Sequence, residues 1–229
     1  MIKNEFHQNI ARTLLYYEIF DYPLTARELF TLSQKNTLTL EQFKGELDTL
    51  VARKQLVKAH GFYSLPQQSK DFSLIRAERQ KIASRRMKTA KLFTSVIKQF
   101  PFVRGVFLSG ELSKNVATKD SDIDYVIVTM PNRLWVTRAM LILFKKVFLL
   151  NKKKYFCLNY FVTEHQLLLQ EKSYYIATEI AHLKPLYNFP LFLKYINTNS
   201  WIKKYFPNYS VFALTSEPLF ETPPVLQKF

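Results

Sequence analysis

Residues 108–129 read LSGELSKNVATKDSDIDYVIVT, and this stretch decides how the chain folds. It begins near Gly110, one of only four glycines, and ends with Asp122 and Asp124 at the start of an apolar run. Side chains alternate faces along a strand, so the two aspartates point the same way with Cα atoms about 6.5 to 7 Å apart. Two such carboxylates can share a divalent cation, whereas without one they repel and raise each other's pKa.

Gly110 lies between a predicted strand at 105–108 and a predicted short helix or turn at 111–116. A glycine at this place lets a ligand approach backbone N–H groups, and helix N-termini attract phosphate oxygens. In proteins Mg²⁺ is typically held by one or two carboxylates together with substrate phosphates. The stretch therefore predicts a phosphate-binding turn that faces a metal-binding aspartate pair.

The order of strand, glycine turn, spacer and Ser-Asp-x-Asp resembles the polymerase-beta-like nucleotidyltransferase superfamily, and the aspartate pair begins twelve positions after Gly110. The resemblance covers about residues 75–165. It implies Mg²⁺, or Mn²⁺, at Asp122 and Asp124, and transfer of a nucleoside monophosphate from an NTP to an unknown acceptor, protein or nucleic acid. It places these residues at the nucleotide: Ser109, Gly110, Glu111, Lys114 and Ser121.

The sequence departs from the family pattern at three positions. Glu111 stands where the family has serine, and Asn115 stands where it has a second glycine. The third catalytic carboxylate corresponds to Asn159, within a strand predicted over 155–162. An amide can bind Mg²⁺ through its oxygen but supplies no charge. Two interpretations therefore stay open: an active nucleotidyltransferase, or a catalytically degenerate nucleotide-binding regulator or adaptor.

Residues 1–68 predict three helices followed by a hairpin. Capping-box patterns begin the second and third helices at Thr25 and Thr39, and Gly61 suits the hairpin turn. This order resembles a winged helix. The predicted elements are helices over 8–20, 25–32 and 39–53 and strands over 55–58 and 62–65.

The charge of this module does not favour nucleic acid. Residues 1–66 carry 8 basic and 7 acidic side chains, and the third helix holds Glu41, Glu46 and Asp48. A DNA-binding surface needs an excess of positive charge. We therefore favour docking to a protein partner or self-association through this module, and a DNA-binding regulator is the weaker alternative.

The remaining pattern completes an α+β fold. The order predicts a winged-helix-like module over 1–68, a nucleotidyltransferase-like mixed sheet with flanking helices over 69–165, and a helical C-terminal extension and tail over 166–229. The further predicted elements are a basic helix over 73–100, a strand over 123–129, helices over 134–150, 174–183, 191–196 and 201–206, and an extended Pro-rich tail over 216–229.

Composition limits the partners and the compartment. The formal net charge of +15 favours anionic partners, and the basic helix is equally consistent with contact to nucleic acid and with a solvated face. Cys157 is the single cysteine, which excludes an internal disulfide and suits a reducing cytosol. The N-terminus lacks a secretory signal, and charges interrupt the most apolar segment, so we predict a cytoplasmic protein without a membrane span.

Overall fold

The computed structural model describes residues 2–34, 37–66, 72–151, 154–211 and 213–214. The predicted tail over 216–229 and the predicted boundary between residues 68 and 69 lie outside these ranges. Among the helices described, none is both long and apolar enough to cross a membrane.

The N-terminal part contains the three predicted helices and the predicted hairpin. Both capping boxes are formed, at Thr25 with Glu28 and at Thr39 with Gln42. A two-residue strand that the pattern did not predict pairs with the second hairpin strand, giving an antiparallel sheet of order β1-β3-β2. The elements are α1 (Ile2–Glu18), β1 (Leu24–Thr25), α2 (Ala26–Leu32), α3 (Leu40–Ala52), β2 (Val57–Ala59) and β3 (Phe62–Ser64).

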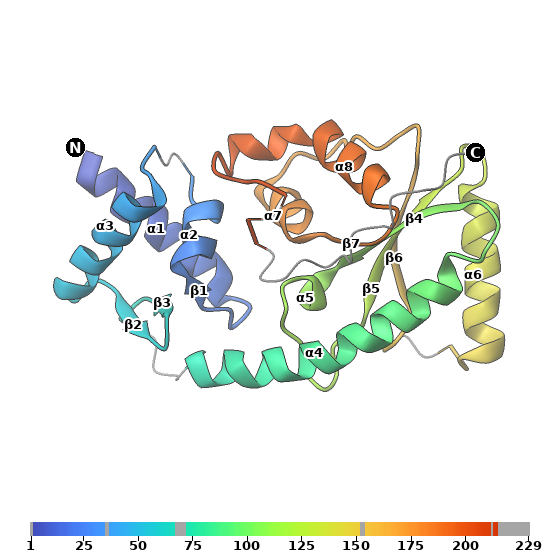
Figure 1. Cartoon of the computed structure of the whole chain (residues 1–229), viewed down its shortest axis with the longest axis horizontal. Coiled ribbons are helices and arrows are strands. Elements are labelled where there is room, and N and C mark those ends of the chain that lie inside the picture. Colours follow the sequence, from blue (N-terminus) through green and yellow to red (C-terminus); the bar gives the residue numbers. More distant parts are fainter. Residues whose placement is uncertain (1, 35–36, 67–71, 152–153, 212, 215–229) are drawn as a thin grey trace, which may run out of the picture.

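A long helix, α4 (Phe72–Ile97), runs from this part to a four-stranded mixed sheet of order β6-β5-β4-β7 (Figure 1). The pairs β4–β5 and β4–β7 are antiparallel, and β5–β6 is parallel. The α+β class is thus confirmed. The strands are β4 (Val103–Ser109), β5 (Asp124–Thr129), β6 (Cys157–Thr163) and β7 (Lys184–Tyr187).

Helices cover both faces of this sheet, because strand residues alternate between two apolar clusters. Val106 and Leu108 pack with α4 and α6 on one face, whereas Phe107, Val126 and Val128 pack with α7 and α8 on the other. Figure 1 shows α4 below the sheet and α7 and α8 above it. The remaining elements are α5 (Gly110–Ser113), α6 (Leu134–Phe148), α7 (Tyr174–His182), α8 (Phe189–Thr198) and the 3₁₀ helix η1 (Ser200–Lys204).

The expectation that the described part of residues 166–229 is helical is wrong at β7. The helices predicted over 174–183 and 191–196 leave residues 184–190 as a connection with Pro185 in it, but Lys184–Tyr187 forms a strand paired with β4. Proline cannot donate to a strand ladder and is therefore confined to edge strands, and β7 is at the edge of the sheet. The C-terminal part thus contributes a strand to the sheet, and the helix expected over 201–206 is a 3₁₀ turn over 200–204.

The N-terminal part and the C-terminal helices share one apolar core. Buried residues of α1 and α2 belong to the same cluster as those of α7 and α8. The Tyr17 hydroxyl lies 2.8 Å from Nε2 of His182, which burial keeps neutral by lowering its pKa. The two parts of the chain are therefore joined by packed side chains as well as by α4.

A buried ion pair fixes α4 against the N-terminal part. The Arg76 guanidinium lies 2.5 Å from the Glu28 carboxylate and also donates to the Tyr22 hydroxyl and the Pro23 carbonyl. It also stacks 3.9 Å from the centre of the Tyr22 ring. The Tyr22 hydroxyl in turn lies 2.9 Å from the carbonyl oxygen of Lys114, just after α5. We call Arg76, Glu28 and Tyr22 the Arg76 cluster.

Candidate functional site

The turn after β4 brings Gly110 against Asp124. Ser109 and Asp124 are opposite one another in the β4–β5 register, and Gly110 has a φ of +68°. A Cβ atom at position 110 would overlap the Asp124 carboxylate oxygen and stand only 3.2 Å from its Cγ atom. Only glycine fits here, because both the backbone angle and the available space exclude a side chain. The close packing of Asp124 against the turn thus explains why a glycine stands at position 110.

The Asp124 carboxylate lies among other acids. Burial raises its pKa, and the charges of Asp122, Glu179 and Glu111 raise it further, while a hydrogen bond from the Cys157 thiol opposes the rise. Burial together with the Asp124 carboxylate raises the pKa of Cys157 to about 12. Cys157 is therefore a protonated hydrogen-bond donor at neutral pH, not a nucleophile.

The loop before Asp122 is held in place by its own hydrogen bonds. The Thr118 amide donates to the Ser121 Oγ atom at 2.7 Å, and the Ser121 amide donates back to the Thr118 hydroxyl at 3.1 Å. Ser121 Oγ donates to the Glu111 carboxylate, and the Arg86 guanidinium donates to the carbonyls of Lys119 and Ser121. Glu111 thus helps to hold this loop in place. One oxygen of the Glu111 carboxylate is occupied by the hydrogen bond from Ser121.

Asn159 lies beside this site, across β5. The β5–β6 register shifts between Tyr125 and Val126, and Asn159 is the extra residue of β6 at this bulge. Its Nδ2 atom donates to Ser109 Oγ at 3.3 Å, and Ser109 Oγ donates to the Asp124 carbonyl at 3.4 Å. The structure therefore brings Asn159 and Ser109 to the same place as Asp124.

Lys114 is directed elsewhere. Its ammonium forms an ion pair of 2.7 Å with Glu179 of α7. Asn115 has a φ of +57°, which suits a position where the family has glycine, and its side chain accepts a hydrogen bond from Lys184. Lys184 is 3% exposed, and burial lowers its pKa to about 7. Sequence reasoning gave no role to Glu179 or Lys184.

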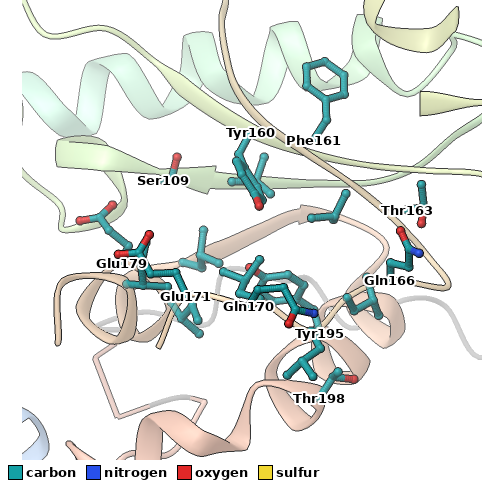
Figure 2. A pocket seen from close by; sticks show the side chains of 18 of the residues that line it. Ser109, Tyr160, Phe161, Thr163, Gln166, Gln170, Glu171, Glu179, Tyr195 and Thr198 are labelled. Carbon is teal, nitrogen blue, oxygen red and sulfur yellow. The ribbon is translucent and has the colours of Figure 1, made fainter. Parts of the chain in front are cut away.

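A cavity of about 1090 Å³ opens next to the site, between β6 and helices α7 and α8 (Figure 2). Ser109 and Asn159 form part of its wall, so it reaches the surroundings of Asp124. In Figure 2 Tyr160 points into the cavity, and Glu171 and Glu179 lie together at the end nearest Ser109. Its ionisable lining residues are Tyr160, Glu164, His165, Glu171, Tyr175, Glu179, Lys194 and Tyr195.

The number of acidic ligands limits which metals the site can hold. Within the described ranges, no three His, Cys, Asp or Glu side chains are grouped so that they could hold a metal ion. Asp122 and Asp124 are two carboxylates, and the nearby side chain of Asn159 is a neutral amide. Two carboxylates suit Mg²⁺, which keeps several water ligands, better than a metal such as Zn²⁺ that needs four protein ligands in structural sites.

The basic helix is partly structural. Arg76 and Arg86 are buried, and Arg79 donates to the carbonyls of Phe20 and Asp21. On α3, Asp48 forms an ion pair of 3.0 Å with Lys58 of β2. These contacts leave fewer free cations for nucleic acid than the sequence pattern indicated.

Comparisons of the chain with protein-family models, with curated proteins and with solved structures found no match.

Proposed function

We propose that the chain binds a nucleoside triphosphate with Mg²⁺ at the Gly110–Asp124 turn and transfers its nucleoside monophosphate to an acceptor hydroxyl. The hydroxyl oxygen would bond to the α-phosphorus and lose its proton to water, while the bond to the β-phosphate breaks and pyrophosphate leaves. The observation that carries this proposal is the close approach of the Asp124 carboxylate to Gly110, together with the charge of Asp122, which raises the pKa of Asp124. Glycine at position 110 lets the backbone of the turn lie this close to the carboxylate.

The residues present fit Mg²⁺. Asp122 and Asp124 are oxygen donors, and Asp124 is a partly buried carboxylate whose pKa is raised by burial and by neighbouring acids. Such a cluster gains most from a divalent cation. Mg²⁺ bound there would neutralise phosphate charge and polarise the α-phosphoryl group.

The chain's own residues would position the reactants. The Gly110 turn holds the backbone against the Asp124 carboxylate, and the Ser121–Glu111 contact holds the loop that precedes Asp122. The Ser109 hydroxyl and the Asn159 amide stand between Asp124 and the cavity, where each can hydrogen-bond a bound molecule. Alignment of this kind contributes much of the rate of phosphoryl transfer.

The cavity favours a small acceptor over a macromolecule. Its volume suits a molecule of drug or metabolite size. Three glutamates line it against one lysine, which disfavours a triphosphate there and favours a neutral or cationic compound. The partly exposed rings of Tyr160 and Tyr175 offer apolar contact. We therefore place a hydroxyl-bearing acceptor in the cavity and the triphosphate at the Gly110 turn.

Nucleotide binding is tested by thermal unfolding of the purified chain with each NTP, with and without Mg²⁺. We expect one or more NTPs to raise the melting temperature by several degrees only when Mg²⁺ is present. The rise should vanish in Asp122→Ala and Asp124→Ala. It should persist in Asp120→Ala, which changes an exposed acid of the same loop. Absence of any rise in the unaltered chain would end the proposal.

Transfer is tested with α-labelled NTP and a cell extract separated into small-molecule, RNA and protein fractions. We expect label in the small-molecule fraction. Label in the RNA or protein fraction would support the transferase activity but contradict the proposal of a small-molecule acceptor.

A second function is favoured by the neutral amide of Asn159 in place of a carboxylate. If NTP and Mg²⁺ raise the melting temperature but no label moves, the chain is a nucleotide-binding regulator. If an Asn159→Asp variant gained transfer activity, the missing negative charge at position 159 would be the reason why the unaltered chain has none.

A further inference from the structure

The outer face of α6 is apolar. This helix packs on the sheet through Thr137 and Leu141, which are fully buried. Figure 1 shows α6 at the end of the molecule opposite the N-terminal part, with no drawn helix or strand beyond it. Its other side and the residues just after it expose large apolar side chains: Trp135, Val136, Leu143, Val147, Phe148 and Leu150.

Three of these residues share one face of the helix, and the other three lie near its ends. Val136, Leu143 and Val147 follow one another at steps of seven and four, the spacing of one helix face, and Leu150 lies just beyond the end of α6. Trp135 and Phe148 stand at the two ends of the helix and are 75% and 69% exposed. A surface helix normally turns polar residues outward, so this face is suited to a partner. We call these six residues the α6 face.

The stretch of sequence that contains the α6 face carries charge of a single sign. Between Tyr125 and Thr163 the sequence contains no acidic residue and seven basic ones: Arg133, Arg138, Lys145, Lys146, Lys152, Lys153 and Lys154. The Arg138 guanidinium lies 5.7 Å from the centre of the Trp135 ring, so positive charge directly adjoins the apolar surface. Whatever covers the α6 face therefore has to be both apolar and anionic.

We propose that the α6 face docks the protein on an anionic lipid bilayer. A second copy of the chain would bring another set of basic residues against the first, and like charges would oppose pairing. An anionic bilayer accepts apolar side chains at its acyl boundary while its phosphates attract lysine and arginine. Tryptophan and phenylalanine at the ends of a helix flanked by basic residues are typical of helices lying in such an interface.

Docking through α6 leaves the Asp124 end of the candidate site accessible. Leu134, the first residue of α6, lines the cavity, but Leu141 of the same helix packs in the cluster on one face of the sheet. Val126 packs on the opposite face, where the cavity adjoins the surroundings of Asp124. The proposal is thus independent of nucleotide transfer, and a chain without transfer activity would still dock.

Co-sedimentation of the whole chain with vesicles tests this docking. We expect binding to vesicles of equal parts phosphatidylglycerol and phosphatidylcholine, weak binding to pure phosphatidylcholine, and a loss of binding as salt rises. The variant Trp135→Ser with Leu143→Ser and Phe148→Ser should bind at least about tenfold more weakly.

Matched controls distinguish binding through the α6 face from nonspecific adsorption of exposed apolar side chains to the vesicles. Leu92→Ser alters a residue of α4 that is 63% exposed, against 62% for Leu143, and should leave vesicle binding unchanged. Lys145→Gln with Lys146→Gln should weaken binding and flatten its salt dependence. Thermal unfolding of each variant verifies that it is folded.

Three outcomes would overturn the proposal. The first is no sedimentation with anionic vesicles at low salt. The second is equal binding by the Leu143→Ser and Leu92→Ser variants. The third is a dimer in analytical ultracentrifugation that the α6-face substitutions dissociate, since this would make the α6 face an interface between copies of the chain.

Discussion

The Arg76 cluster and the Asp124 site both hold charge away from bulk water, and they are built in opposite ways. Glu28 has a guanidinium at 2.5 Å, and Arg76 has carboxylate, hydroxyl and carbonyl acceptors. Asp124 instead has Asp122, Glu179 and Glu111 as charged neighbours, and among these Glu179 is paired with Lys114. The charge of the Arg76 cluster is neutralised by its partner within the fold, whereas the Asp124 carboxylate lies among acids, which is the arrangement that we propose to be completed by a cation.

The largest effect is expected from breaking the compensated cluster. Arg76→Met leaves the Glu28 carboxylate buried without its cation, which should lower the free energy of unfolding by about 3–5 kcal/mol. Urea denaturation of the variant and the unaltered chain measures this change in the free energy of unfolding. Lys81→Met, at an exposed position of the same helix, should change stability by no more than about 0.5 kcal/mol. Equal losses in both variants would contradict the role of the pair.

The next effect concerns the glycine at the site. Gly110→Ala forces a side chain into the left-handed region and against the Asp124 carboxylate. We expect a loss of about 2 kcal/mol together with loss of the NTP-dependent rise in melting temperature. Gly45→Ala is the matched control, because nothing lies within 4 Å of the added Cβ in α3 and alanine favours a helix. It should be neutral or stabilising by up to about 1 kcal/mol.

Lys184 should make the free energy of unfolding depend on pH, with an effect of moderate size. Its pKa is about 7 in the folded protein and 10.5 without burial, so the unfolded chain binds more protons between these values. Stability from this group therefore rises with pH above 7, by about 1 kcal/mol per pH unit. The Lys184→Met variant should be the more stable near pH 7, with an advantage that shrinks between pH 7.5 and 8.5. Lys194→Met, at an exposed position of α8, should show no such change.

The smallest effect is expected at Asp124. Its raised pKa means that the folded state binds a proton more tightly than the unfolded state, so the ionised group lowers stability at neutral pH. This penalty disappears as pH falls through the folded pKa toward 3.8. Asp124→Asn should gain at most about 1 kcal/mol at pH 7, because solvent screens a carboxylate that is not fully buried. A clear loss of stability would contradict the repulsion.

Local features of the fold were predictable from the sequence, and features that depend on distant residues were not. The helices of the N-terminal part follow from capping boxes and apolar spacing, which act within one turn. The strand β7 was missed because Pro185 is unfavourable locally and is tolerated only at a sheet edge. An edge is defined by the order of the strands in space, which the pattern of one segment does not contain.

The same distinction applies to the candidate site. The sequence pattern indicated that the Gly110 turn faces the aspartate pair, and the register that sets Ser109 opposite Asp124 brings Gly110 and Asp124 together. Glu179 was missed because α7 brings it back to the site, and Lys114 was expected at a phosphate because its partner lies 65 positions away. A carboxylate within an amphipathic helix carries no local signal that separates it from a solvated side chain.

The core shared by the N-terminal part and the C-terminal helices has a consequence for dividing the protein into fragments. The helices α1 and α2 bury their apolar side chains against α7 and α8. A fragment that lacks either part would expose that surface to water and aggregate. The smallest piece of the chain that can be purified in a folded state should therefore contain both parts.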